Sequence, residues 1–163
     1  KRPKTLPCVI HQSTNKGEKW LIIVGLFDEK PYEVFCVENK YNLPNTNLSG
    51  NFTKVKQGQY KLEIDNQITV EDFSHEMTDE QAAITRLVST SLRHGADIKF
   101  IVEQLNKCEG DLFSFTKSLS RVLKKYIPEG AKSTVTCKDC DSNNVIFEEG
   151  CMSCKDCGSS KCG

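Results

Sequence analysis

The last 27 residues begin with Cys137-Lys-Asp-Cys140 and end with Cys151-Met-Ser-Cys154-Lys-Asp-Cys157-Gly-Ser-Ser-Lys-Cys162-Gly163. Six of the nine cysteines lie in this stretch, and the tetrapeptide Cys-Lys-Asp-Cys occurs in it twice. A Cys-x-x-Cys turn followed by glycine is typical of a zinc knuckle, because both thiolates point to one side and glycine turns the chain back without a Cβ clash. Two knuckles therefore predict a tetrahedral zinc site with four sulfur ligands.

The residues between the two knuckles predict a β-hairpin. Residues 145–147 (Val-Ile-Phe) are strand-forming, residues 148–150 (Glu-Glu-Gly) form a turn, and residues 151–153 pair back. This predicts a small zinc ribbon.

Four of the six cysteines satisfy one zinc ion, and the favoured ligands are Cys137, Cys140, Cys154 and Cys157. Cys151 and Cys162 are then left over. Cys162 lies on a Gly/Ser-rich end that we expect to be mobile. An exposed thiol beside a second thiol is what thiol–disulfide exchange requires. The sequence therefore predicts a structural zinc plus a redox pair, Cys151 and Cys162.

Two alternatives stay open. In the first, the zinc ligands are Cys137, Cys140, Cys151 and Cys154, and the redox pair is Cys157 and Cys162. In the second, a structural zinc is accompanied by two bystander thiols without a redox role. The repeated knuckle and Gly158 favour the first-named ligand set.

Composition limits the classes of function. The chain has 163 residues, enough for a domain with a moderate core plus a ribbon, and its 22 basic and 22 acidic residues balance. Residues 130–163 hold four Lys against five Asp or Glu, which disfavours a nucleic-acid-binding ribbon. No apolar run has membrane-spanning length, and no secretory signal is present.

Cysteines in knuckle spacing without a secretory signal predict reduced thiols in the cytoplasm. We therefore expect a cytoplasmic protein without nucleic-acid or membrane partners. The chain begins with Lys1, so we expect a fragment or a processed product of a longer protein.

Hydrophobic patterning predicts strands first and helices afterwards. The predicted strands span residues 8–13, 19–28, 32–38, 52–56 and 60–65, with a short addition at 68–70. Alternation in 60–65 predicts a sheet with one solvated face. The fold class is therefore α+β: an antiparallel sheet of about five strands with three helices on one face, followed by a small zinc ribbon. The predicted domains are 1–130 and 131–163, the latter comprising a linker and the ribbon.

Three helices are predicted after residue 77. The first starts with a capping box at Thr78 and Gln81 and ends at Gly95, and its buried stripe is predicted to be Ile84, Leu87, Val88 and Leu92. The second begins after Asp97, and the third covers 112–126. The basic face of the third helix, predicted to be solvated, comprises Lys117, Arg121, Lys124 and Lys125.

Several segments resemble the C-terminal region of adenosylcobalamin-dependent (class II) ribonucleotide reductases. They are residues 2–7 (Arg-Pro-Lys-Thr-Leu-Pro), 24–27 (Val-Gly-Leu-Phe), 31–35 (Pro-Tyr-Glu-Val-Phe), 84–95, 98–105 and the ending 149–163. Many members carry a Thr-Ser-Cys-Pro-Asp-like segment before the last helix. Residues 110–115 (Gly-Asp-Leu-Phe-Ser-Phe) contain no cysteine, so a role tied to that cysteine does not carry over.

The resemblance implies a role in ribonucleotide reduction. Such enzymes reduce ribonucleotides in a catalytic barrel that uses adenosylcobalamin, and each turnover oxidises an active-site cysteine pair. A C-terminal cysteine pair re-reduces that disulfide and is itself reset by an external, thioredoxin-like thiol donor. The implied partners are the barrel of the same reductase and this donor, with a homo-oligomer as the assembly.

The barrel and its cobalamin site lie outside these residues, so we do not expect the chain to be catalytic alone. The competing hypothesis is a nucleic-acid-binding zinc-ribbon protein, which the acidic balance of the ribbon disfavours.

Overall fold

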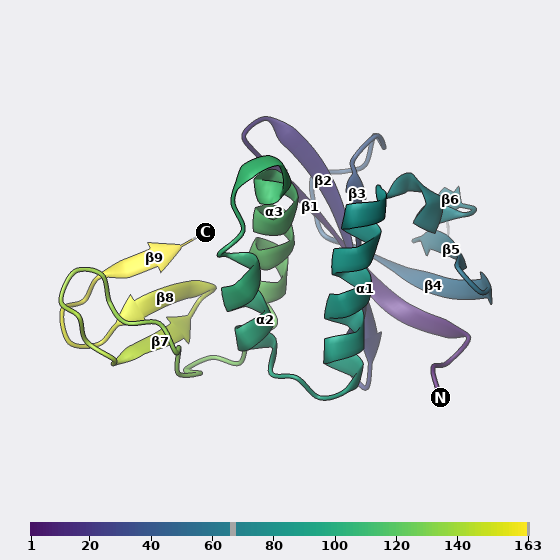
Figure 1. Ribbon diagram of the computed structural model, residues 1–163. Coiled ribbons are helices and arrows are strands. Elements are labelled where there is room, and N and C mark those ends of the chain that lie inside the picture. The colour runs from purple at the N-terminus through teal and green to yellow at the C-terminus, as the bar shows by residue number, and fades with distance from the viewer. Residues whose placement is uncertain (66–67, 163) are drawn as a thin grey trace.

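Six strands form one antiparallel sheet, in the order β3-β2-β1-β4-β5-β6, in the computed structural model, which describes residues 1–65 and 68–162 (Figure 1). The strands are β1 (Thr5–Asn15), β2 (Glu18–Phe27), β3 (Lys30–Glu38), β4 (Leu48–Lys56), β5 (Gln59–Ile64) and β6 (Ile68–Val70). The predicted α+β class is confirmed, and the short strand at 68–70 brings the sheet to six strands.

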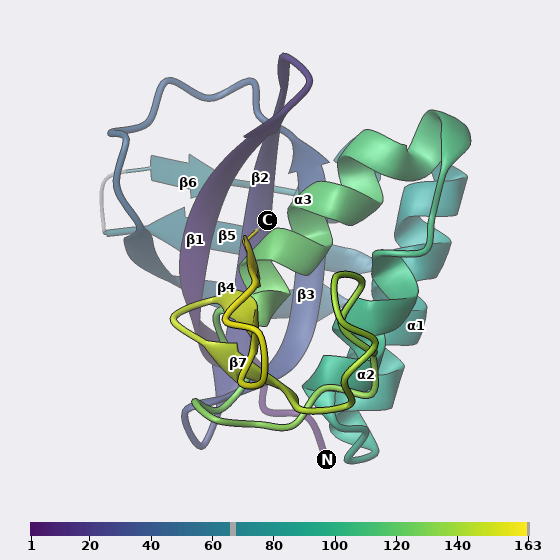
Figure 2. The same ribbon diagram turned by 90° about the vertical axis from the view of Figure 1, so that its left-hand side faces the viewer.

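Strand β2 is buried on both faces, whereas β5 has one solvated face, as the alternation in 60–65 predicts: Leu62 and Ile64 are buried, and the side chains of Lys61 and Glu63 are 32% and 41% exposed. On β2, Trp20, Ile22 and Val24 belong to a core shared with the helices, whereas Leu21 and Ile23 belong to a second core on the opposite face. That second core forms because β4–β6 run across β1–β3 and cover them (Figure 2). Residues from both halves meet there: Leu21, Ile23, Phe35 and Val37 from one half, and Phe52, Leu62 and Ile64 from the other.

Three α-helices follow the sheet, and Figure 1 shows them on one side of β1–β3. They are α1 (Asp79–Arg93), α2 (Ile98–Leu105) and α3 (Phe113–Lys124), with the 3-10 turns η1 (Phe73–Glu76) and η2 (Gly110–Leu112). The capping box is present, because the Gln81 amide donates to Thr78 Oγ1 and Thr78 N donates to Gln81 Oε1. Gly95 follows α1 with φ +80°, where a side chain would be strained.

Two residues on the helices differ from the predicted pattern. Leu87 is 69% exposed, because α1 contacts the sheet through Val88 and the small residues Thr85 and Ser89. Ser89 Oγ accepts a hydrogen bond from the backbone amide of Val34, which requires close approach of α1 to β3. Lys124, predicted to be solvated, is only 5% exposed.

A buried ion cluster attaches the start of the chain to the helices. The Glu33 side chain is fully buried and pairs with Arg2 and with Arg93 of α1, whose guanidinium lies 3.0 Å away. Gly25 sits opposite Glu33, and a Cβ there would lie 3.0 Å from Glu33 Cγ. The absent side chain therefore leaves room for the buried carboxylate.

The C-terminal ribbon is a separate three-stranded antiparallel sheet, in the order β7-β8-β9. Its strands are β7 (Val145–Glu148), β8 (Cys151–Cys154) and β9 (Ser160–Cys162). The stretch predicted as a linker lies along β7: Phe147 N donates to Ala131 O at 2.9 Å, and Ser133 N donates to Val145 O at 2.9 Å. Phe147 belongs to the core shared with the helices, so the ribbon packs against the α+β domain.

Within residues 1–65 and 68–162, no helix is both long enough and apolar enough to cross a membrane.

Candidate metal centre and disulfide

The two Cys-Lys-Asp-Cys segments form equivalent turns. In the first, the Asp141 amide donates to the Cys137 carbonyl at 2.9 Å, and in the second the Gly158 amide donates to the Cys154 carbonyl at 3.0 Å. Asp141 and Gly158 occupy the same position of the repeat, with φ of 58° and 77°. The left-handed conformation that the turn requires is thus supplied once by glycine and once by aspartate, a residue that tolerates it.

The two turns also support each other through their aspartates. Asp139 in the first turn accepts a hydrogen bond from Ser159, which lies just after the second turn. Reciprocally, Asp156 in the second turn accepts one from Ser142, which lies just after the first turn. Asn144 adds a bond to Asp156 at 3.0 Å. These bonds from Ser142 and Asn144 lower the pKa of Asp156. The Lys-Asp repeat therefore has a structural role that the cysteine spacing alone did not reveal.

Four sulfur atoms converge between the turns. Cys137, Cys140, Cys154 and Cys157 place their Sγ atoms within 4.8 Å of one another. The Sγ atoms are 3.6 Å apart in each of the pairs Cys137–Cys157 and Cys140–Cys154. Sulfurs at about 2.3 Å from a tetrahedral zinc ion lie about 3.8 Å apart, so the spacing fits. These four cysteines are positioned to bind a metal ion.

The ionisation of this cluster also favours a cation. The pKa of Cys154 is lowered to about 7, chiefly because the backbone amide of Cys157 donates to its sulfur. The pKa of Cys140 is instead raised to about 12: the Ser142 amide acts to lower it, but the neighbouring thiols outweigh that effect. Thiolates this close repel one another, and a divalent cation removes that repulsion.

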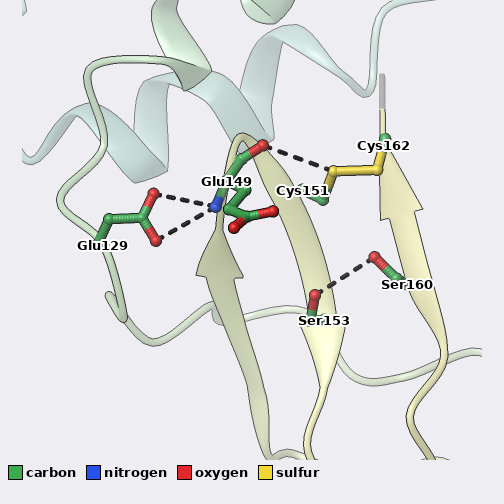
Figure 3. The surroundings of a disulfide bond; sticks show 6 residues. All are labelled: Glu129, Glu149, Cys151, Ser153, Ser160 and Cys162. Carbon is green, nitrogen blue, oxygen red and sulfur yellow. Dashed lines mark hydrogen bonds between the residues drawn. A yellow bond between two sulfur atoms is a disulfide. The ribbon is translucent and has the colours of Figure 1, made fainter.

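The remaining two cysteines of the ribbon form a disulfide. Cys151 of β8 and Cys162 of β9 lie directly opposite each other in the strand register, with Cα atoms 4.3 Å apart, and their sulfurs are bonded (Figure 3). Cys162 is exposed and Cys151 is half-buried. A disulfide between exposed strands is open to attack by an external thiolate.

The ribbon has two different faces, because successive side chains of a strand point to opposite sides. Cys151, Ser153, Ser160 and Cys162 share one face, and Ser153 and Ser160 hydrogen-bond across it at 3.3 Å (Figure 3). Met152 packs on the other face against the core that includes Phe147. The disulfide is therefore on the face turned away from the domain core.

Carboxylates border the disulfide. Glu129, at the end of the domain, accepts a hydrogen bond from the Glu149 amide at 3.0 Å, and the Cys151 sulfur lies 3.8 Å from the Glu149 carbonyl (Figure 3). Glu148 is paired with Lys155 at 2.6 Å. The bond from Glu149 to Glu129 holds the hairpin turn that carries Cys151 against the domain, whereas the Glu148–Lys155 pair lies within the ribbon.

The expectation of a mobile end at Cys162 needs correction. Residues Ser160–Cys162 form β9 and pair with β8. The reason is the turn at Gly158, which returns the chain antiparallel to β8 and brings Cys162 opposite Cys151. The disulfide is thus held on a sheet.

The three other cysteines lie outside this cluster. Cys8 and Cys36 are buried in the sheet, and Cys108 is partly buried and free. Desolvation raises the pKa of Cys8 to about 12 and also raises the pKa of Cys36, so both thiols stay protonated. They pack as small apolar residues.

One buried carboxylate that positions the ribbon had no signal in the sequence. Glu103 of α2 accepts hydrogen bonds from the Ser133 hydroxyl at 3.2 Å and from the Thr134 amide at 3.1 Å, and from the Thr134 hydroxyl. On a helix a single glutamate normally indicates a solvated face. Only the packing of 133–134 over α2 gives it this role.

The fold and the site define a class: an α+β domain that carries a cysteine ribbon positioned to bind a metal ion. Residues 6–128 match the family model described as the NrdJ homologue C-terminal domain. The match covers most of the chain, which therefore belongs to this family, a C-terminal module of ribonucleotide reductases. The cysteine ribbon follows the matched residues. Comparisons with curated proteins and with solved structures give no match.

Proposed function

We propose that the chain is the C-terminal module of an adenosylcobalamin-dependent (class II) ribonucleoside-diphosphate reductase and passes reducing equivalents to its catalytic barrel. The supporting observation is the Cys151–Cys162 disulfide, held on the outer face of a ribbon whose four other cysteines are gathered into one cluster. The barrel, upstream of this chain, binds adenosylcobalamin and forms deoxyribonucleotides for DNA synthesis.

In this proposal Cys137, Cys140, Cys154 and Cys157 hold a structural zinc ion. Zinc supplies charge compensation for the thiolates and a tetrahedral cross-link between the two turns. The sulfur spacing and the engagement of Cys151 with Cys162 support this ligand set over the alternative set containing Cys151.

The relay is a pair of thiol–disulfide exchanges. The Cys162 thiolate attacks one sulfur of the oxidised cysteine pair in the barrel, and the other barrel sulfur leaves as a thiolate. The Cys151 thiolate then attacks Cys162, which forms the Cys151–Cys162 disulfide and releases the second barrel thiolate. Two electrons pass to the barrel, and the two thiolates that it gains take up protons.

A thioredoxin-like dithiol completes the cycle by reducing Cys151–Cys162. The exposure of Cys162 supports access for such a protein donor. We further propose that the reductase is a cytoplasmic homo-oligomer without nucleic-acid or membrane partners. The carboxylates of Glu148 and Glu149 beside the disulfide support the first of these exclusions, since nucleic acids repel acidic surfaces.

Replacing Cys162 with serine in the full-length reductase tests the relay. We expect unchanged zinc content, loss of multiple turnover with a thioredoxin-type donor, and activity with dithiothreitol, which reaches the barrel directly. Cys108→Ser is the matched control, because this free cysteine lies outside the ribbon, and it should keep activity with both reductants. Full activity of Cys162→Ser with the protein donor would refute the relay.

A further inference from the structure

The Cys151–Cys162 disulfide shares a surface hollow with three carboxylates. The hollow has a volume of about 470 Å³ and is lined by both cysteines, Ser153, Ser160, Glu129, Glu148 and Glu149. Among the residues that the structure describes, no lysine, arginine or histidine lines this hollow. A molecule that reduces the disulfide therefore meets carboxylates beside the sulfurs.

Two of the three carboxylates have no cation to compensate them. Glu148 pairs with Lys155 at 2.6 Å, so that pair is neutral as a whole. Glu129 and Glu149 form no ion pair within residues 1–65 and 68–162. Glu129 accepts a hydrogen bond from the Glu149 backbone amide at 3.0 Å, which orients its carboxylate without neutralising it. The hollow therefore carries the negative charges of Glu129 and Glu149.

The two sulfurs of the disulfide are not equally accessible. Cys162 is exposed on β9, the edge strand of the ribbon, whereas Cys151 is half-buried and its Sγ lies 3.8 Å from the Glu149 carbonyl oxygen. An entering thiolate therefore reaches the Cys162 sulfur more easily, and Cys151 is the sulfur that is displaced. Figure 3 shows the Glu149 carboxylate on the side of the hairpin turn towards Cys151. Negative charge thus develops on Cys151 in the presence of a fixed negative charge.

Thiol–disulfide exchange responds to such charges because its reacting sulfurs are themselves charged. The attacking group is a thiolate, and its negative charge passes to the sulfur that it displaces. A fixed negative charge nearby raises the energy of both the approach and the displacement, whereas a positive charge lowers it. A reductant that carries positive charge beside its sulfur compensates Glu129 and Glu149 during the reaction.

We propose that Glu129 and Glu149 select the reductant of the disulfide by charge, and that this reductant is a protein dithiol with basic side chains around its attacking cysteine. The inference rests on the relay proposed above, in which an external dithiol reduces Cys151–Cys162. Complementary charge accelerates association with such a donor. The same surface disfavours small anionic thiols such as glutathione, whose two carboxylates outnumber its one ammonium group.

The donor supplies both electrons in two exchanges. Its first thiolate attacks Cys162 Sγ, the Cys151–Cys162 bond breaks, and Cys151 leaves as a thiolate that takes up a proton. Its second thiolate then attacks the donor sulfur bonded to Cys162, which forms the donor's own disulfide and releases Cys162 to take up the second proton. The basic side chains of the donor act in the first exchange, where the charge moves past Glu149.

Reduction of the zinc-loaded chain by three small thiols tests the selection. Cysteamine carries an ammonium group, mercaptoethanol carries no further charge, and mercaptoacetate carries a carboxylate. Mass spectrometry after acid quenching follows the loss of the disulfide. Each rate constant per thiolate is divided by that for hydroxyethyl disulfide, which removes intrinsic differences between the thiols. We expect corrected rates about tenfold higher for cysteamine than for mercaptoacetate at low ionic strength, and a ratio near one in about 1 M salt.

Glu149→Gln and Glu129→Gln should each bring the cysteamine-to-mercaptoacetate ratio about threefold closer to one, and the double variant should bring it near one. Glu149→Asp keeps the charge and should keep most of the ratio. Glu80→Gln is the matched control, because this exposed glutamate lies in the first turn of α1, away from the ribbon (Figure 1). A purely structural role of the two glutamates would instead change the rates of all three thiols equally.

Three results would overturn the proposal. One is equal corrected rates for cysteamine and mercaptoacetate in the unchanged chain. A second is a ratio that persists in the double variant. A third comes from the full reductase, where turnover with the protein donor should fall as salt rises, and turnover insensitive to salt would exclude recognition by charge. Failure of the relay is distinguishable, because full activity of Cys162→Ser with the protein donor would refute the relay and leave the small-thiol ratio intact.

Discussion

The α+β domain and the ribbon are held together by different physical means. The domain has two apolar cores, one between the sheet and the helices and one between the two halves of the curled sheet. The ribbon has one small cluster of its own, in which Cys137, Val145 and Cys154 are buried. Three small side chains cannot offset the backbone entropy of some 27 residues at about 1–2 kcal/mol each. The ribbon therefore depends on cross-links in place of a core, and the Cys151–Cys162 disulfide is one of them.

This contrast explains where the reactive thiols lie. In the domain, burial raises the pKa of cysteines and makes them inert, as at Cys36. In the ribbon, the backbone amide of Cys157 lowers the pKa of Cys154, and the strand register produces an accessible disulfide. Cysteine chemistry is concentrated in the part of the molecule that has the least apolar packing.

The largest expected effect comes from removing the metal, which should unfold the ribbon and leave the domain folded. Cys137→Ser should abolish binding of one zinc ion per chain and unfold the ribbon, because a structural zinc contributes about 10 kcal/mol or more of folding free energy. Metal analysis and two-dimensional NMR measure both effects, and the signals of the domain should persist. Cys108→Ser should retain the zinc. One zinc per chain in Cys137→Ser would show that the ligand set is wrong.

The second prediction concerns a variant that destabilises the α+β domain and leaves metal binding unchanged. Leu119 is fully buried in the core between sheet and helices, so Leu119→Ala should lower the free energy of unfolding by about 2–5 kcal/mol. Leu87→Ala is the control on α1, and its exposed side chain predicts a change within about 0.5 kcal/mol. Urea unfolding measures both. Equal losses for the two variants would contradict the assigned packing, and zinc content should stay constant.

The third prediction concerns pH and is the smallest. Burial, and secondarily the charge of Lys125, lower the pKa of His11 from 6.5 to about 4, and its Nε2 lies 2.7 Å from the Tyr126 hydroxyl. The unfolded chain therefore takes up a proton at a higher pH than the folded chain. Stability present above pH 6.5 should be lost as the pH falls towards 4, by about 1–3 kcal/mol after allowance for solvent screening.

Urea unfolding between pH 7.5 and 4.5 measures this slope. His11→Phe should flatten it, because this variant has no imidazole to take up the proton. A slope that survives in His11→Phe would assign the acid sensitivity to other groups. The metal cluster offers a separate comparison, since proton competition for its thiolates should release zinc at low pH without unfolding the domain.

Local pattern predicted most of the elements. The capping box at Thr78, the glycine after α1 and the repeated cysteine turns were all visible in the chain, because each depends on residues within a few positions of one another. The fold class followed from the order of strands and helices. The four-cysteine cluster was predictable for the same reason, since knuckle spacing fixes where each pair of sulfurs points.

The errors arose where distant segments meet. Leu87 fits the predicted apolar stripe of α1. However, α1 approaches β3 through Ser89, so the Leu87 side chain is exposed to solvent. Cys162 was expected on a mobile end, and pairing with β8 places it in a sheet.

By itself, the sequence determined the class of the fold, the two cysteine turns and the surplus of two thiols, because periodicity and spacing act over a few residues. Tertiary structure alone decided two things: the choice of Cys151 over Cys157 as the partner of Cys162, and the burial of Glu33 between two arginines. Each of these depends on strand register or on packing between segments far apart in the chain. Local sequence patterns do not predict such contacts, because the residues meet only when the chain has folded.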